Sequence, residues 1–91
     1  MNDALNVLKA RFSKRILADA DEIVQAMREG DYATLERVIH GLAGAAGLFG
    51  YSALSASALA IDAEFGSGNK PSNESFIRLV DLIRAESALY S

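Results

Sequence analysis

The chain has 91 residues and no cysteine, which predicts one small domain spanning residues 1–91 and excludes disulfides, thiolate metal sites and cysteine nucleophiles. Its formal net charge is -3 and its basic residues form no run, so nucleic acid is not an expected partner. The N-terminal residues carry charge and form no long apolar segment, so no signal peptide is expected, and the lack of cysteine fits a cytoplasmic location.

The first predicted helix covers residues 4–29, with Asp3 as its N-cap and Gly30 at its end. Apolar residues recur along it at spacings of three and four, which predicts one stripe that faces a core. The members of this stripe are Leu5, Leu8, Phe12, Ile16, Ala20, Ile23, Val24 and Met27.

A second helix is predicted from an N-cap at Asp31 to about residue 49, where Gly50 ends it. Ser52 is predicted to cap a third helix that runs to about residue 65. Residues 66–71 contain two glycines and the only proline, and they predict a loop.

Ser72 or Asn73 is predicted to cap a fourth helix. The residues of this helix expected to face inward are Phe76, Leu79, Val80, Ile83 and either Leu89 or Tyr90. No segment shows the alternation typical of a strand. Because short connections join amphipathic helices, the sequence predicts an all-α fold, an antiparallel up-down four-helix bundle.

Residues 38–61 contain no permanently charged side chain and form a stretch long enough to cross a bilayer. They are mostly Ala, Gly and Ser, which insert weakly, and residues 50–52 in their middle predict the end of one helix and the start of another. No cluster of Lys or Arg marks a cytoplasmic flank, so no membrane segment is expected.

The only histidine, His40, lies in the middle of the second predicted helix. On a helical wheel the large apolar residues of this helix lie opposite His40, so its imidazole is predicted to point into solvent. Gly44 and Gly47 share its side of the wheel, where no partner helix is expected. Each glycine costs a helix about 1 kcal/mol relative to alanine. We therefore expect these glycines to leave room for a second molecule that approaches His40.

The sequence gives little support to several possible functions of this histidine. His40 can also be a solvated side chain without a function, and this alternative stays open. The serines nearest to it in the C-terminal direction begin at Ser52, beyond the helix end, so no serine–histidine pair is indicated. Glu36 one turn away makes a poor metal site with one histidine, and no metal is expected. The glycines lack the spacing and the preceding strand of a nucleotide-binding loop. A lone exposed imidazole best suits the receipt of a phosphoryl group from a partner that supplies the other catalytic groups.

The spacing around His40 resembles the histidine-containing phosphotransfer (Hpt) domains of bacterial phosphorelays over about residues 12–65. That family places leucine, lysine, glycine, a small residue and glycine at two, three, four, six and ten residues after its histidine. The positions here are His40, Leu42, Ala43, Gly44, Ala46 and Gly50. Further positions that resemble the family are Gly30–Asp31, Leu35, Leu54, Ala58 and Ile61–Asp62.

The resemblance implies that His40 accepts a phosphoryl group from the phospho-aspartate of a receiver domain and passes it to another receiver. It implies receiver domains and a hybrid sensor histidine kinase as partners of a monomeric carrier. The carrier itself is not an enzyme and holds no ATP, metal or cofactor, because Mg²⁺ belongs to the receiver. Arg37, Ala43, Gly44 and Gly47 are the expected docking and phosphoryl-supporting positions.

Ala43 is a departure from the family, because it replaces the lysine thought to help hold the phosphoryl group. We expect Arg37, one turn before His40, to supply positive charge instead. The replacement also favours an alternative, in which the chain is a helical adaptor that binds a receiver or kinase through the same surface without being phosphorylated.

Overall fold

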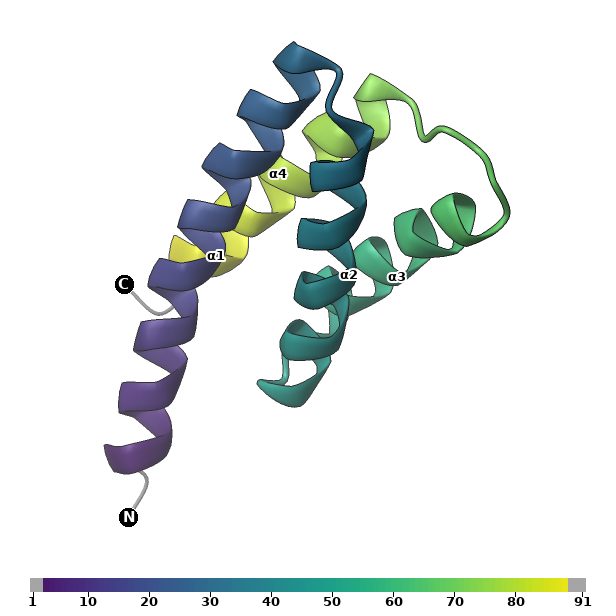
Figure 1. Ribbon diagram of the computed structural model, residues 1–91. Helices are drawn as coiled ribbons and strands as arrows, with labels where there is room; N and C mark the ends of the chain where they lie inside the picture. Colours follow the sequence, from purple (N-terminus) through teal and green to yellow (C-terminus); the bar gives the residue numbers. More distant parts are fainter. Residues whose placement is uncertain (1–2, 89–91) are drawn as a thin grey trace.

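A computed structural model describes residues 3–88, which form four helices and no strand (Figure 1). The helices are α1 (Asp3–Glu29), α2 (Tyr32–Leu48), α3 (Ser52–Gly66) and α4 (Asn73–Ala88). α1 packs against α2 and α4, and α3 packs against the same two helices. The predicted all-α class is confirmed, and the antiparallel up-down order of the helices stays a prediction.

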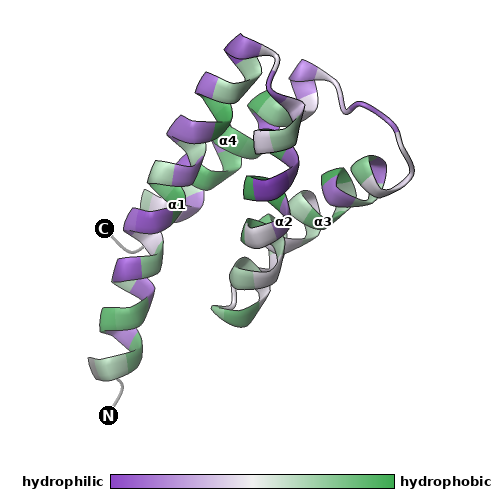
Figure 2. Ribbon diagram, in the orientation of Figure 1, coloured by the Kyte–Doolittle hydropathy of each residue, from purple (hydrophilic) through white to green (hydrophobic). Residues whose placement is uncertain are grey.

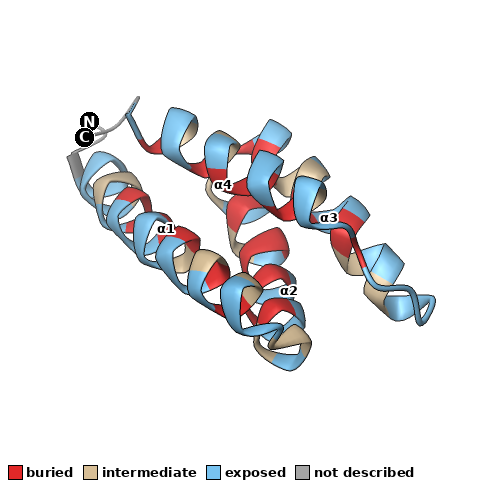
Figure 3. Ribbon diagram, turned by 90° about the horizontal axis from the view of Figure 1, so that it is seen from above, coloured by how far each residue is buried: buried red, intermediate tan, exposed pale blue. Residues whose placement is uncertain are grey.

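Each helix contributes one apolar side to a shared core. Figure 2 shows apolar residues recurring along all four helices, and Figure 3 shows the buried residues on the sides that face neighbouring helices. The largest fully buried apolar side chains of the helices are Ile16, Ile23, Leu35, Ile39, Leu42, Leu54, Phe76, Leu79 and Ile83. Burying one such side chain stabilises a fold by about 1.5–3 kcal/mol, so this core holds the four helices in place.

The first turns of α1 differ from the prediction. Leu5 and Leu8 were predicted to face the core, but they are 47% and 45% exposed. α1 has 27 residues whereas α2, the next longest helix, has 17, so the beginning of α1 extends past its neighbours (Figure 1). An amphipathic stripe predicts which side of a helix is apolar, and only the partner helices decide how much of that side is covered.

The two residues predicted to mark the ends of α2 act as predicted. Asp31 caps α2 by accepting hydrogen bonds from the backbone nitrogen of Thr34 at 3.1 Å and from its hydroxyl at 2.6 Å. The bond from this hydroxyl lowers the pKa of Asp31. Gly50 follows α2 with φ +83°, a backbone conformation that glycine adopts without steric cost.

The other predicted caps are partly correct. Ser72 accepts a hydrogen bond from the backbone nitrogen of Ser75 at 3.2 Å and so caps α4. Ser52 is the first residue of α3 rather than its cap, and Tyr51 precedes α3 without a side-chain capping bond. α1 is described from Asp3 onward, and the predicted capping by the Asp3 side chain lies outside the described part of the chain. The predicted inward positions 89 and 90 lie outside the described residues.

A buried polar contact joins the first and last helices. The hydroxyl of Ser13 donates a hydrogen bond to the backbone oxygen of Ser87 at 2.9 Å, and the two hydroxyl oxygens are 3.1 Å apart. Because each buried hydroxyl has a partner, the α1–α4 contact includes polar groups without leaving them unsatisfied.

None of the described helices is both long enough and apolar enough to cross a bilayer. The uncharged stretch at residues 38–61 is divided between α2 and α3 by the turn around Gly50.

Candidate functional site

His40 lies at the middle of α2, on its exposed side. Its side chain is 76% exposed, whereas Val38, Ile39 and Leu42 around it in the sequence are buried. The core residues of α2 fix the rotation of the helix about its axis, and this rotation carries the imidazole outward. The predicted orientation of His40 is therefore confirmed.

Asp62 of α3 holds one side of the imidazole. Its Oδ2 lies 3.0 Å from Nδ1 of His40, and its side chain is 24% exposed. An ionised carboxylate only accepts hydrogen bonds, so this contact favours the tautomer with its proton on Nδ1. The lone pair of a neutral ring is then on Nε2, the nitrogen farther from the helix.

This role of Asp62 was missed in the sequence. The pair Ile61–Asp62 was noticed there only as part of a family resemblance. Asp62 stands 22 positions after His40, and a helical wheel describes one helix at a time. The sequence does contain a signal for this role. Asp62 directly follows Ile61, which is buried, and α3 packs against α2, so an acidic side chain at position 62 lies close to the helix that carries His40.

A hollow of about 390 Å³ opens beside the imidazole, and we refer to it as the His40 hollow. Its lining residues are Ala33, Glu36, Arg37, His40 and Asp62. Arg37 reaches this hollow, but its Nη2 lies 2.8 Å from Oε2 of Glu22 on α1. The side chains of Arg37 and Glu22 are 66% and 44% exposed, so this ion pair is solvated and weak.

A second acid–base pair lies on α1 near Arg37. Nε of Arg15 is 3.8 Å from Oδ2 of Asp19, an oxygen that is buried and has no hydrogen-bond partner in the described part of the chain. Burial raises the pKa of Asp19, and the positive charges of Arg15 and Arg37 oppose this rise. The α1 side of the site therefore carries a largely buried carboxylate next to Arg15.

The two predicted docking glycines have different surroundings. A Cβ on Gly44 would meet nothing within 4 Å, whereas one on Gly47 would lie 3.1 Å from the hydroxyl oxygen of Ser55. The prediction that no helix lies on this side was wrong for Gly47, because α3 packs closely there. Gly44 is thus the glycine that leaves open space near His40.

The sequence model of the Hpt domain family matches residues 7–88. The chain belongs to the Hpt domain family. Comparisons with curated proteins and with solved structures found no match. Hpt domains carry phosphoryl groups on histidine in phosphorelays, where they interact with receiver domains and kinases, and they act as carriers rather than as classical enzymes.

The position of the family lysine is occupied differently in this Hpt domain. Ala43 was predicted among the docking residues, but it is 3% exposed and belongs to the core. The cause is the close approach of α3, where the Ser55 hydroxyl donates a hydrogen bond to the backbone oxygen of Ala43 at 3.1 Å. The methyl group of Ala43 therefore adds almost nothing to the exposed surface.

Within residues 3–88 of this Hpt domain, no group of three or more His, Asp or Glu side chains is arranged to hold a metal ion. The polar groups gathered at the site are the imidazole of His40, the carboxylates of Glu36 and Asp62, and the guanidinium of Arg37.

Proposed function

We propose that this chain, as one antiparallel up-down bundle of residues 1–91, carries a phosphoryl group on His40 between the aspartates of two receiver domains. The observation that carries this proposal is the exposed imidazole whose Nδ1 faces Asp62 at 3.0 Å. A hybrid sensor histidine kinase supplies the first receiver. The chain acts as a cytoplasmic monomer without a cofactor, and Mg²⁺ resides on the receiver.

In the forward step, the lone pair of Nε2 attacks the phosphorus atom of the receiver's phospho-aspartate. An N–P bond forms, the P–O bond to the aspartate breaks, and the aspartate leaves as a carboxylate. The ring keeps its proton on Nδ1 and becomes positively charged. Because the carboxylate of Asp62 lies beside that proton, it stabilises the charge as it develops. The second receiver reverses these steps with its own aspartate.

The surroundings of His40 suit this exchange. Gly44 has nothing within 4 Å of its Cβ position, which leaves clearance for the loops of a receiver. Arg37 lines the His40 hollow, and we propose that it supplies the cation that position 43 lacks. To do so it exchanges Glu22 for the phosphoryl oxygens, an exchange that an exposed ion pair permits at low cost.

The test is to incubate the chain with a phosphorylated receiver, with the wild type beside His40→Gln. We expect acid-labile label on the wild type only, since phosphohistidine is acid-labile and glutamine cannot form it. Because His40 is exposed, the variant keeps the helical circular-dichroism spectrum of the wild type. Label on His40→Gln, or none on the wild type, rejects the proposal.

The adaptor alternative has its own observation, the lack of a lysine at position 43. It predicts that an unphosphorylated receiver binds the chain while no label is ever transferred. Titration with the receiver, run beside the labelling assay, separates the two functions.

A further inference from the structure

The charged groups that line the His40 hollow are unbalanced. Two of its lining residues, Glu36 and Asp62, are carboxylates, whereas Arg37 is the one guanidinium among them. The α2 residues that line the hollow are His40 and residues before it, because side chains on a helix incline toward its N-terminus. A phosphoryl group on the outer ring nitrogen of His40 would therefore lie close to the side chains of Glu36 and Arg37.

Glu36 is the carboxylate of this hollow whose charge is not offset. It lies one helical turn before His40 on α2, and it is exposed. Among the described residues 3–88 it makes no ion pair and no side-chain hydrogen bond. Asp62, in contrast, faces Nδ1 of the imidazole at 3.0 Å, so its charge acts on the ring proton. The charge of Glu36 is left to act on the other side of the ring.

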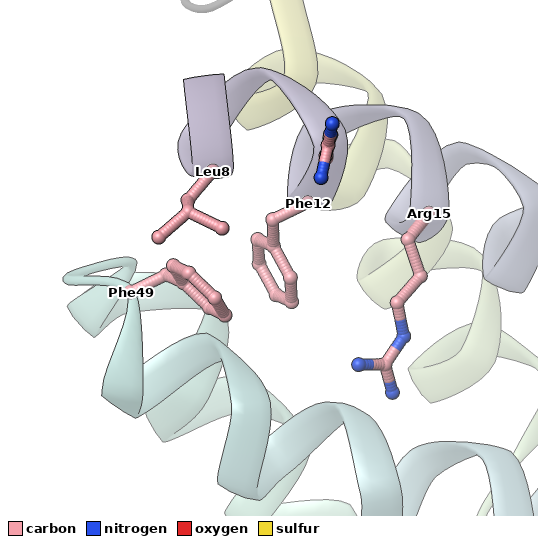
Figure 4. A pocket seen from close by; sticks show the side chains of 5 residues that line it. Leu8, Phe12, Arg15 and Phe49 are labelled. Carbon is pink, nitrogen blue, oxygen red and sulfur yellow. The ribbon is translucent and has the colours of Figure 1, made fainter. Parts of the chain in front are cut away.

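The cations near His40 compensate for Glu36 only in part. Arg37 lies 2.8 Å from Glu22 and leaves that partner whenever it turns to another anion. Arg15 is the next guanidinium, and Figure 4 shows it extending from α1 beside Phe12 and toward α2. Its Cζ lies 5.9 Å from the centre of the Phe12 ring, and it does not line the His40 hollow. A second anion placed in this hollow therefore meets a net negative charge.

We propose that Glu36 sets the direction of phosphoryl transfer. Its carboxylate repels the phosphoryl oxygens and raises the free energy of phosphorylated His40 relative to the free imidazole. The transfer equilibrium thereby shifts away from His40 and toward the aspartate of the receiver. This inference rests on the proposed function and deepens it, because it assigns a residue that makes the chain a better donor than acceptor.

The step that Glu36 favours is the release of the phosphoryl group. The receiver's aspartate attacks the phosphorus atom, a P–O bond forms, and the bond between Nε2 and phosphorus breaks. The ring loses its positive charge and keeps its proton on Nδ1, beside Asp62. One phosphoryl group moves and no proton is exchanged, so the change at the site is the departure of two negative charges from the vicinity of Glu36.

A docking role for Glu36 makes a different prediction. A carboxylate that only pairs with a cation of the receiver changes how fast and how tightly the two proteins meet. It leaves the equilibrium constant between the free proteins unchanged, because it contacts neither the phosphoryl group nor the bare imidazole after they separate. The equilibrium ratio of phosphorylated chain to phosphorylated receiver is therefore the quantity that identifies the proposed role.

The experiment compares Glu36→Gln with Glu64→Gln and the wild type. Both variants replace an exposed carboxylate by a neutral group of similar size. Glu64 is on α3 two residues after Asp62, and so on another side of that helix. Each protein is mixed with a phosphorylated receiver at low concentration until the ratio is constant, at low salt and at about 1 M salt. Labelling by phosphoramidate, a small donor that needs no docking, is run in parallel.

We expect Glu36→Gln to raise the ratio of phosphorylated chain to phosphorylated receiver about three- to fivefold at low salt, the size of effect that an exposed charge produces. The difference should largely vanish at about 1 M salt, where charges are screened beyond about 3 Å. Glu64→Gln should follow the wild type at both salt concentrations. Because Glu36 is exposed and unpaired among the described residues, its variant should keep the helical circular-dichroism spectrum.

Three results would overturn the role of Glu36. One is an unchanged ratio in Glu36→Gln, and a change in KM alone would then assign this carboxylate to docking. Another is an equal change in both variants, which would make the effect one of overall charge. The third is a difference of the same size at both salt concentrations, which would show that the carboxylate charge is not its cause.

The failure of this inference can be distinguished from a failure of the proposed function. A wild type that is labelled, with a ratio that Glu36→Gln does not alter, keeps the carrier function and rejects the role of Glu36. A wild type that neither the receiver nor phosphoramidate labels rejects the carrier function, and the inference with it.

Discussion

Asp62 of α3 accepts a hydrogen bond from the imidazole of His40 on α2, with Oδ2 and Nδ1 3.0 Å apart. The two residues come from the helix pair that packs together most extensively. The position of this carboxylate is therefore set by the core beneath it, and the imidazole orientation depends on the packing of α3.

Replacing Asp62 with alanine should slow phosphorylation of His40 about two- to tenfold. This range corresponds to the loss of one hydrogen bond, about 0.5–1.5 kcal/mol, from the transition state. Nitrogen NMR of the ring should show the Nδ1-protonated tautomer in the wild type and a mixture in the variant. Glu64→Ala, an exposed change on the same helix, is the control. An unaltered tautomer and rate in the Asp62 variant would contradict a positioning role.

Removing the guanidinium of Arg37 should reduce the rate of phosphoryl transfer from a receiver about two- to fivefold. The estimate follows from the small energy, up to about 1 kcal/mol, of an exposed charge contact. Glu22→Gln releases Arg37 from its 2.8 Å ion pair and should transfer at least as fast as the wild type. Equal rates for the wild type and Arg37→Ala would discard the role of this cation.

Alanine at Gly44 should raise the free energy of unfolding by about 1 kcal/mol, the difference between the two residues inside a helix. Its Cβ meets nothing within 4 Å, whereas a Cβ on Gly47 meets the Ser55 hydroxyl at 3.1 Å. Gly47→Ala should therefore gain clearly less stability. Urea denaturation measures the free energy of unfolding of both variants. Equal gains in stability would show that Ser55 of α3 moves aside without an energetic cost.

A larger side chain at Gly44 tests the open space directly. Gly44→Leu should keep the fold, because nothing within the chain occupies that space. It should lower the rate of transfer from a receiver about tenfold while labelling by phosphoramidate stays the same, since only the receiver requires the clearance. Undiminished transfer from the receiver would place its docking surface elsewhere.

Asp19 should make stability depend on pH. Burial raises its pKa in the folded state above the usual 3.8, so the folded protein binds the proton more tightly than the unfolded chain. Its contribution to the free energy of unfolding therefore falls as pH rises from about 3.8 through the raised value. Asp19→Asn should be more stable than the wild type at neutral pH, and this difference should vanish at lower pH.

Thermal denaturation from pH 3 to pH 8 provides the measurement, with the exposed neighbour Asp21→Asn as the control. A gain from Asp19→Asn that is the same at every pH would show that the carboxyl charge is not its cause.

The sequence predicted what one helix determines by itself. The helical spacing of the apolar residues in α2 predicted Ile39 and Leu42 in the core and His40 in solvent. The prediction holds because only one rotation of a helix about its axis buries its apolar side. Asp31 and Gly50 marked the ends of α2 because their preferences act over a few residues.

Contacts between helices could not be predicted in this way. The pairing of Arg37 with Glu22 and the fit of Gly47 against Ser55 depend on how far neighbouring helices are apart. A wheel contains no such distance. The same limit explains Leu8, whose stripe position is correct although no helix covers it.

The bond between Ser13 and Ser87 spans 74 positions, whereas His40 and Asp62 are 22 positions apart. Both residues of the site precede α4 in the chain, so their contact closes over a short stretch of sequence. The α1 side of the core closes only when α4, far along the chain, packs against it. A chain cut short before residue 87 would keep the imidazole and its carboxylate in sequence while leaving the Ser13 side of α1 uncovered.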